Sequence, residues 1–278
     1  MIVGVAAGLP PDAWSDPVHD RAGSCDHRAM IEQRHERRVA LITGAARRIG
    51  ARIARRLHGA GYDLALHYRH SRSQMDALIA ELEAARRGST LALQADLGQF
   101  DRLSELIDES IDRYGRLDAL INNASTYYAT PLGQVTLQHW DELFASNARA
   151  AFFLAQAAAP QLKAARGAIV NIADIYAERP LPGHSVYCMA KAALVMATKA
   201  LAQELGPDVR VNAVAPGNIL WSDNPVKAET LEIVQIRTAL ARQGDPDDIA
   251  DAVLWLVDGN GYITGQVVAI DGGRTLFI

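Results

Sequence analysis

Cysteine is scarce in this sequence, with only Cys25 and Cys188 among 278 residues. Two cysteines are too few for the disulfide framework that small secreted proteins use in place of a large core. We therefore expect a reducing, cytoplasmic location. Cys188 lies in a segment with helical periodicity, where a buried thiol is the expected state.

An excess of charge of one sign is also missing, as are long apolar runs. The 28 lysines and arginines against 32 aspartates and glutamates give a net charge of -4, and the pI is about 6.1. This balance indicates neither a nucleic-acid nor a membrane-surface partner. No apolar run approaches the roughly 20 residues that cross a bilayer. The apolar patch at the N-terminus lacks the basic residues that begin a signal peptide.

The composition is that of a protein with a sizeable core, since 49% of the residues are apolar and 22% are charged. At this length one large α/β domain is expected. Residues 1–36 differ from the rest because they contain three prolines and no apolar stripe, and we expect a loosely ordered tail there. The histidines of this tail lack the close spacing of metal ligands, so no metal site is expected.

From residue 37 onward, short apolar runs alternate with segments of helical periodicity. We expect strands at 39–42, 63–68, 90–95, 117–121, 168–172, 209–214 and 266–270, and one long helical region at 137–162 with a bend at Pro160. This alternation predicts the α/β class: a single doubly wound Rossmann-type domain over residues 37–278, with a seven-stranded parallel sheet and helices on both faces. An extra segment is expected at about 218–243.

The turn after the first strand has the position of a phosphate-binding loop. In doubly wound folds the ligand lies at the carboxyl ends of the strands, with its phosphate on the first helix N-terminus. Gly44 permits a tight turn and Gly50 permits close packing of the helix on the sheet. The middle glycine of a G-x-G-x-x-G spacing is missing, so this loop alone does not distinguish a cofactor site from an ordinary turn.

The end of the second strand favours a phosphorylated cofactor. Residues His67 to Arg72 contain no carboxylate that would bind the ribose hydroxyls of NADH. Arg69 and Ser71 can instead bind a 2′-phosphate, and Arg47 in the first loop adds positive charge. We therefore predict NADPH over NADH, the alternative being a solvated basic turn.

Polar residues follow the next two strands as well. Asp96 and Leu97 follow the third strand, and Asn123 and Ala124 follow the fourth, at strand ends that face the expected cofactor groove. Asn147 lies within an apolar helical run, as either a buried polar brace or an exposed residue.

A tyrosine and a lysine four residues apart share one helix face in a later segment. The phenol of Tyr187 has an ordinary pKa of roughly 10, and a lysine cation held near it would lower that value and make it a usable acid. The expected fifth strand delivers an acid, Asp174, into the loop before this helix. Without a cofactor site, the alternative is a buried tyrosine and a surface lysine.

Taken in order, the motifs resemble the short-chain dehydrogenase/reductase family over about residues 38–278. The motifs are Thr-Gly-x3-Arg-Ile-Gly, Asn-Asn-Ala, the mid-helix Asn147, Tyr-x3-Lys, Pro-Gly at 216–217, Ile-Thr-Gly at 263–265 and Asp-Gly-Gly at 271–273. The resemblance implies an NAD(P)(H)-dependent oxidoreductase, often a homotetramer. Tyr187 would be the acid, Lys191 would lower its pKa and hold the ribose, and Asn147 would support a proton-relay water. The implied cofactor-binding residues are Gly44, Arg47, Arg48, Ile49, His67, Tyr68, Arg69, Ser71, Asp96, Leu97, Asn123, Ala124, Lys191, Pro216 and Gly217.

Departures from the general family pattern indicate the substrate. Most such enzymes carry a serine where this chain has Asp174. An ionised aspartate cannot donate a hydrogen bond to a carbonyl oxygen and would repel the negative charge that develops there. A simple ketone substrate is therefore disfavoured, and one rich in N–H groups is favoured.

Arg48 in place of the middle glycine, together with Tyr127 and Asp174, resembles the pteridine reductase branch, which includes dihydromonapterin and dihydrofolate reductases. In that branch the matching residues line the pterin site, which implies a substrate-binding set of Arg48, Ser125, Tyr127, Asp174 and Tyr187. The implied reaction is hydride transfer to a C=N carbon of a dihydropterin, with Tyr187 protonating the ring nitrogen.

Two other functions stay open at this point. One is a carbonyl reductase of the 3-oxoacyl type, in which Asp174 has another role. The other is a non-catalytic NADPH-binding regulator, which the intact Tyr187, Lys191 and Asn147 argue against, because a sensor has no need of an acid.

Overall fold

The computed structural model describes residues 37–219, 236–259 and 261–277. The expected tail at 1–36 and residues 220–235 of the expected extra segment lie outside these ranges.

Seven parallel strands form one sheet in the order β3-β2-β1-β4-β5-β6-β7. The strands are β1 (Val39–Ile42), β2 (Asp63–Tyr68), β3 (Thr90–Gln94), β4 (Ala119–Asn122), β5 (Ala168–Ile172), β6 (Arg210–Pro216) and β7 (Val267–Ile270). Each lies within one or two residues of its expected position. The chain runs outward from β1 to β3 and then returns to β4 on the other side of β1, so the strand order reverses there. The predicted fold class is confirmed.

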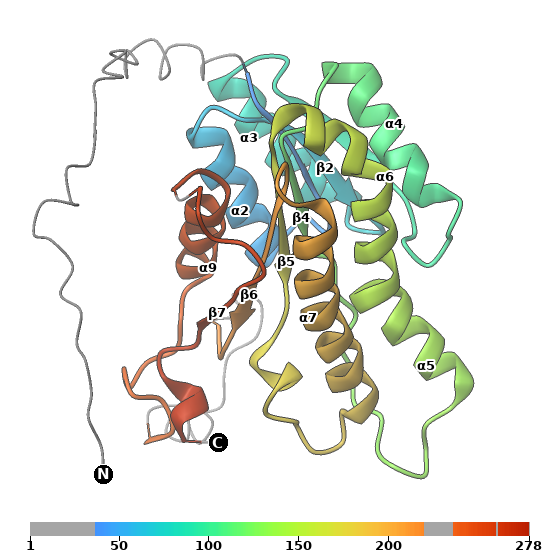
Figure 1. Cartoon of the computed structure of the whole chain (residues 1–278), viewed down its shortest axis with the longest axis vertical. Helices are drawn as coiled ribbons and strands as arrows, with labels where there is room; N and C mark the ends of the chain where they lie inside the picture. Colours follow the sequence, from blue (N-terminus) through green and yellow to red (C-terminus); the bar gives the residue numbers. More distant parts are fainter. Residues whose placement is uncertain (1–36, 220–235, 260, 278) are drawn as a thin grey trace, which may run out of the picture. The chain divides into compact units, whose positions relative to one another are not determined.

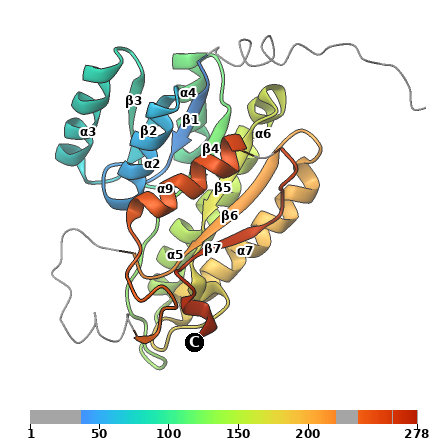
Figure 2. The same ribbon diagram turned by 90° about the vertical axis from the view of Figure 1, so that its left-hand side faces the viewer.

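Helices cover both faces of the sheet (Figures 1 and 2). They are α2 (Arg48–Gly59), α3 (Arg72–Ala85), α4 (Arg102–Tyr114), α5 (Leu137–Phe144), α6 (Ala150–Ala165), α7 (Ser185–Leu205) and α9 (Pro246–Leu254). Successive strand residues alternate between two cores: Ala40 and Ile42 pack with α2, α3 and α9, whereas Val39 and Leu41 pack with α4, α6 and α7. This period of two is the reason that a fully buried strand is apolar at every position.

The long helical region is interrupted at a different place from the one expected. It divides into α5, a π-helical turn at Ala145–Arg149, and α6, while Pro160 lies inside α6. The expected bend at Pro160 is therefore not where the helix changes type. In the π turn Asn147 is buried, and its side-chain amide donates to the carbonyl of Leu143, 2.9 Å away. The turn places a polar side chain inside an otherwise apolar run.

The helix α7 has an environment that its composition alone does not reveal. With 21 residues and a mean hydropathy of 1.2, it reaches the range of a membrane span, alone among the helices within the described ranges. Half of the apolar stretch of this helix is buried inside the fold, as in the core helix of a globular domain. Its apolar residues therefore serve the core, and the buried Tyr187 and Lys191 lie in its N-terminal half, close to the end of β5.

A ladder of buried amides fixes α7 against the sheet. Asn122 at the end of β4 donates to the Asn171 carbonyl oxygen, 2.9 Å away, and Asn171 donates to the Thr198 hydroxyl, also 2.9 Å away. The Thr198 hydroxyl donates in turn to the carbonyl of Leu194 at 2.9 Å. Because these groups are buried, each bond that is lost leaves an uncompensated polar atom.

Thr198→Val tests this ladder, since valine keeps the shape of threonine but cannot accept from Asn171. We expect the free energy of unfolding to fall by about 1–3 kcal/mol in urea titrations. Ser104→Ala on α4 removes an exposed hydroxyl and should change it by less than about 0.5 kcal/mol. Equal effects of the two substitutions would show that the ladder does not stabilise the fold.

Candidate active site

The loops after β1 and β4 are hydrogen-bonded into one unit at the carboxyl edge of the sheet. The Thr43 hydroxyl oxygen accepts from the backbone N–H groups of Asn123 (2.9 Å) and Ala124 (3.0 Å). The Asn123 side-chain amide donates to the carbonyls of Thr43 (2.8 Å) and Gly44 (3.0 Å). Thr43 and Asn123 therefore hold the glycine loop in place; Thr43 stood in the sequence motif but was not assigned a role there.

Two glycines of this loop have no room for a side chain. Gly44 has a φ of +63°, and a Cβ there would lie 2.9 Å from the Ala124 Cα. A Cβ on Gly50 would lie 2.2 Å from the Gly44 carbonyl oxygen. At the far side of the edge, Gly217 packs against Asp271, whose Cα would be 2.6 Å from an added Cβ. At these points the backbone therefore packs directly against neighbouring segments, which only glycine permits.

The residues at the end of β2 differ in their exposure to solvent. His67 and Tyr68 are buried, and their side chains bond within the fold. Arg69 is exposed, and its guanidinium lies 3.9 Å from the Asp96 carboxylate. Ser71 directly precedes α3. Among the predicted phosphate-binding residues here, Arg69 and Ser71 therefore have the accessible positions.

The remaining predicted cofactor residues come from the same edge. Arg47 is exposed just before α2, and Arg48 begins α2 with a left-handed φ of +52°. Ile49 is partly buried in the first turn, and Leu97 is buried after β3. The list is completed by Pro216, which ends β6.

Asp174, Tyr187 and Lys191 form a buried cluster between β5 and α7. The Tyr187 hydroxyl donates to one carboxylate oxygen of Asp174 at 2.7 Å, and the other oxygen accepts from the Tyr176 backbone N–H at 2.9 Å. The Lys191 ammonium donates to the Ile172 carbonyl at 2.8 Å and lies 5.8 Å from the centroid of the Tyr187 ring. The structure thus brings together three of the four residues that the sequence placed in the catalytic site, the fourth being Asn147.

The acid–base properties of this cluster follow from its burial. Burial raises the pKa of the Asp174 carboxyl, and burial together with the Asp174 carboxylate raises the pKa of the Tyr187 phenol. Burial lowers the pKa of Lys191 to about 8, against the opposing effect of Asp174. On balance the pKa of Tyr187 is raised, which is opposite to the net lowering expected from Lys191. The charge in contact with the phenol oxygen is a carboxylate, and Tyr187 is held firmly in its protonated form.

Asn147 is a buried brace, which decides between the two possibilities left open for it. Its amide nitrogen donates to the Thr126 carbonyl at 2.8 Å, and its amide oxygen accepts from the Ser125 hydroxyl at 2.7 Å. The Ser125 hydroxyl, whose proton goes to Asn147, acts to lower the pKa of the Tyr187 phenol. Asn147 therefore holds Ser125, and Asp174 separately holds the Tyr187 hydroxyl.

An aromatic wall stands beside Tyr187. The Tyr127 ring is 49% exposed and meets the Tyr187 ring edge to face, with centroids 4.9 Å apart. It also stacks on the imidazole of His184, with centroids 4.8 Å apart and an interplanar angle of 10°. His184 was missed by sequence reasoning. Its position three residues before Tyr187, at the start of the same helix, was the signal that could have found it.

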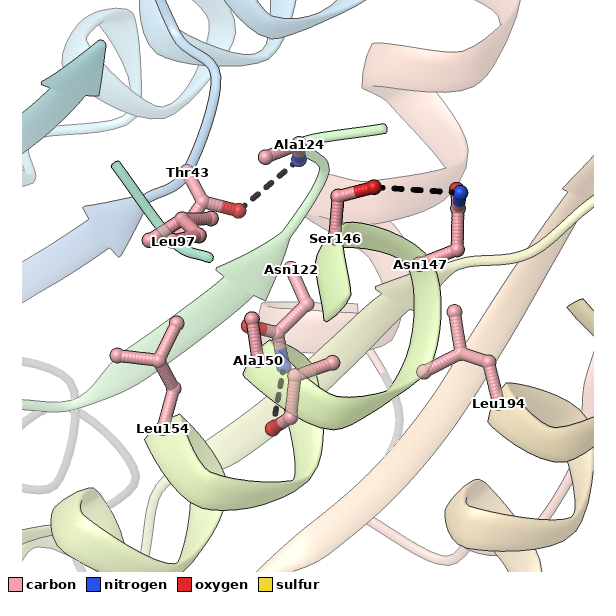
Figure 3. A pocket seen from close by; sticks show the side chains of 10 residues that line it. Thr43, Leu97, Asn122, Ala124, Ser146, Asn147, Ala150, Leu154 and Leu194 are labelled. Carbon is pink, nitrogen blue, oxygen red and sulfur yellow. Dashed lines mark hydrogen bonds between the residues drawn. The ribbon is translucent and has the colours of Figure 1, made fainter. Parts of the chain in front are cut away.

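A small cavity of about 10 Å³ adjoins the brace, lined by Thr43, Asn122, Asn147 and neighbouring apolar side chains (Figure 3). This is about the space that one water molecule requires. The cavity is therefore too small to be the substrate pocket. Within the described ranges, no group of three or more His, Cys, Asp and Glu side chains is arranged to hold a metal ion.

The sequence of this chain is similar to those of known reductases. A family model described as enoyl-(acyl carrier protein) reductase matches residues 44–275. Pteridine reductase 1 of Leishmania tarentolae is 35% identical, over 86% of this chain and 96% of its own length. A 3-oxoacyl-[acyl-carrier-protein] reductase of Staphylococcus aureus is 36% identical, over 84% and 96%.

Among solved structures, a blue fluorescent protein from a metagenomic library, crystallised in complex with NADPH, is similar in both sequence and fold. It is 36% identical, with a TM-score of 0.80, over 85% of this chain and 97% of its own. The pterin and 3-oxoacyl reductases are equally similar to the chain, so overall identity does not identify the substrate.

Lys191→Met tests the electrostatics of the cluster through stability. The pKa of Lys191 falls from its ordinary 10.5 to about 8, so between these pH values the folded state binds fewer protons than the unfolded state. Lys191 therefore destabilises the fold below pH 8, and this cost disappears as the pH rises toward 10.5. We expect the variant to be more stable at pH 7 by on the order of 2 kcal/mol, after allowing for the lost bond to Ile172.

Urea unfolding at several pH values between about 7 and 10 checks this expectation. The advantage of Lys191→Met should shrink above pH 8, while Lys199→Met, which removes an exposed lysine from the same helix, should show a constant small difference. A pH-independent advantage for Lys191→Met would contradict the assigned pKa direction.

Proposed function

The chain belongs to the short-chain dehydrogenase/reductase family of NAD(P)H-dependent oxidoreductases, and from that premise we propose that it reduces a pterin of the dihydropteridine or dihydrofolate class with NADPH. The observation that carries the proposal is the 2.7 Å hydrogen bond from the Tyr187 hydroxyl to the Asp174 carboxylate.

The carboxyl edge of the sheet fits a dinucleotide cofactor. Gly44 and Gly50 let the loop after β1 turn and pack closely onto its neighbours at the start of α2, and α2 has no acidic residue in its first turn to repel a phosphate. Arg47, Arg69 and Ser71 would hold the 2′-phosphate. The choice of NADPH is supported by these basic residues and by the similar structure solved with NADPH.

Asn123, Ala124, Asp96 and Leu97 would line the groove of this cofactor, together with Pro216 and Gly217 at the end of β6. Lys191 would reach the ribose from α7, since its ammonium lies at the end of β5. Bound NADPH supplies a hydride to the substrate.

The protein itself would contribute the proton of the Tyr187 hydroxyl and the charges of Lys191 and Asp174 beside it. Tyr187 holds its proton because burial and Asp174 both raise its pKa. A substrate nitrogen that gains negative charge when hydride is added to the neighbouring carbon would be basic enough to take that proton. Below its pKa of about 8, Lys191 carries a positive charge that offsets the negative charge left on the phenol and the carboxylate.

Asp174 favours a nitrogen heterocycle over a ketone. An ionised carboxylate accepts hydrogen bonds from N–H groups but repels the negative charge that develops on a ketone oxygen. Tyr127 adds a flat aromatic surface beside Tyr187, suited to stacking on a flat ring. Ser125 and Arg48 complete the proposed substrate-binding set.

A 3-oxoacyl reductase is the second candidate, and one observation favours it. Ser125 is a serine that affects the pKa of Tyr187, and it lies in the loop after β4, whereas most family members carry their serine at the position of Asp174, after β5. Such a hydroxyl could donate to a carbonyl oxygen. The relative of this activity in Staphylococcus aureus agrees with that possibility.

A homotetramer in the cytoplasm is part of the proposal. Trp140 on α5 and Met189 and Met196 on α7 are 40%, 43% and 63% exposed, which supports contact between subunits. Light scattering on the purified protein should give four times 30.1 kDa, and the mass of a monomer would contradict the tetramer.

NADPH oxidation with dihydrobiopterin, dihydromonapterin, dihydrofolate and an acetoacetyl thioester tests the proposed activity. We expect turnover with at least one pterin and a loss of about 100-fold or more in kcat for Tyr187→Phe, because the proton donor is removed. Tyr128→Phe, which changes a neighbouring tyrosine bonded to Glu142, should keep most of the activity. Activity on the thioester alone would establish the second candidate, and equal rates with NADH and NADPH would contradict the phosphate site.

A further inference from the structure

His67 lies inside the sheet with both of its ring nitrogens engaged. The side chain is 2% exposed. Its Nδ1 accepts from the Gly44 backbone N–H at 3.1 Å, and its Nε2 lies 3.1 Å from the Ala95 carbonyl oxygen. Because a carbonyl can only accept, Nε2 carries the proton, and the geometry assigns one neutral tautomer.

The two partners of this imidazole belong to different loops. Gly44 begins the glycine loop after β1, and Ala95 begins the turn after β3 that contains Asp96. In the sheet, β2 lies between β1 and β3, so His67 is placed to join both neighbours. Backbone bonds run the same way, from Ala45 N–H to the His67 carbonyl (2.8 Å) and from Ala95 N–H to the Tyr68 carbonyl (3.2 Å).

The bond to Gly44 has a specific consequence for the glycine loop. Gly44 is the residue with the left-handed φ, where the chain turns away from β1. Its N–H is directed inward to His67 and is not offered to a ligand. The orientation of this first peptide determines where the following peptides of the loop lie.

We propose that His67, as the neutral Nε2–H tautomer, is a positioning residue for the cofactor, which acts by accepting from the Gly44 N–H and so orienting the first peptide of the glycine loop. The proposal rests on the proposed binding of NADPH. It also changes the role of His67 from the one that sequence implied, since a buried ring acts on the cofactor through Gly44 and not by touching a phosphate.

The charges around the ring agree with a neutral imidazole. Burial lowers the pKa of His67 to about 4, while Asp96 acts to raise it and Arg69 to lower it. A protonated ring would direct a second donor at the Gly44 N–H, which removes the acceptor that this N–H requires.

Two amide substitutions separate the two hydrogen bonds of His67. His67→Asn places an amide oxygen where Nδ1 accepts from Gly44, but does not reach Ala95. His67→Gln places an amide nitrogen where Nε2 donates to Ala95, but leaves the Gly44 N–H without its acceptor. Fluorescence titration of the full-length protein with NADPH and with NADH measures the binding constants, and urea unfolding measures stability.

We expect His67→Gln to weaken NADPH and NADH to the same extent, by about tenfold or more, and His67→Asn to stay within about threefold of the wild type. Arg69→Ala serves as the contrast, because loss of a phosphate contact should weaken NADPH and leave NADH unchanged. ¹⁵N NMR of the free protein should show a protonated Nε2 and an unprotonated Nδ1 on His67.

Three results would overturn the proposal. Equal losses of affinity in both amide variants, in step with their losses of stability, would show a purely structural residue. A loss confined to NADPH would show a phosphate contact, and the other tautomer would contradict the assigned bonds. Failure of the wild type to reduce any pterin would sink the proposed substrate but not these binding and NMR results.

Discussion

The carboxylate of Asp174 lies in a partly buried position, where an ionised group is costly unless hydrogen bonds replace the water it loses. Two donors supply them: the Tyr187 hydroxyl at 2.7 Å and the Tyr176 backbone N–H at 2.9 Å. The first of these bonds joins the loop after β5 to α7, and the Lys191 ammonium joins the same helix to the end of β5. The buried ladder of Asn122, Asn171 and Thr198 adds further hydrogen bonds between β4, β5 and α7.

The cofactor edge is constructed by the same means. Thr43 and Asn123 tie the loops after β1 and β4 together, and His67 ties the first of them to the turn after β3. In each case a buried side chain with donors and acceptors on both sides replaces hydrogen bonds that an irregular loop cannot make with itself. The loops at the cofactor edge are therefore positioned by hydrogen bonds from Thr43, Asn123 and His67, and these residues need not contact the ligand themselves.

The sequence was sufficient for the fold, because strands buried on both faces are apolar throughout and helices between them leave stripes of regular spacing. It also placed Asp174, Tyr187 and Lys191 in one site, since a strand end and one helical turn determine their positions. It did not reveal the π turn at Asn147, because one additional residue in a helical turn does not disturb an apolar pattern enough to be seen. The direction of the Tyr187 pKa was also beyond it, since this depends on burial and on which charge meets the phenol oxygen. The stacking of His184 on Tyr127 depends on how a loop folds back, which no periodicity records.

The proposed choice of a nitrogen heterocycle over a ketone depends most on the Asp174 carboxylate. The most direct test is the ratio of kcat/KM for a dihydropterin to kcat/KM for an acetoacetyl thioester, compared between the wild type and Asp174→Ser. Serine supplies a donor for a ketone oxygen and removes the acceptor for N–H groups, so the ratio should fall by about tenfold or more. A ratio that stays constant or rises on this substitution would contradict the role given to the Asp174 carboxylate.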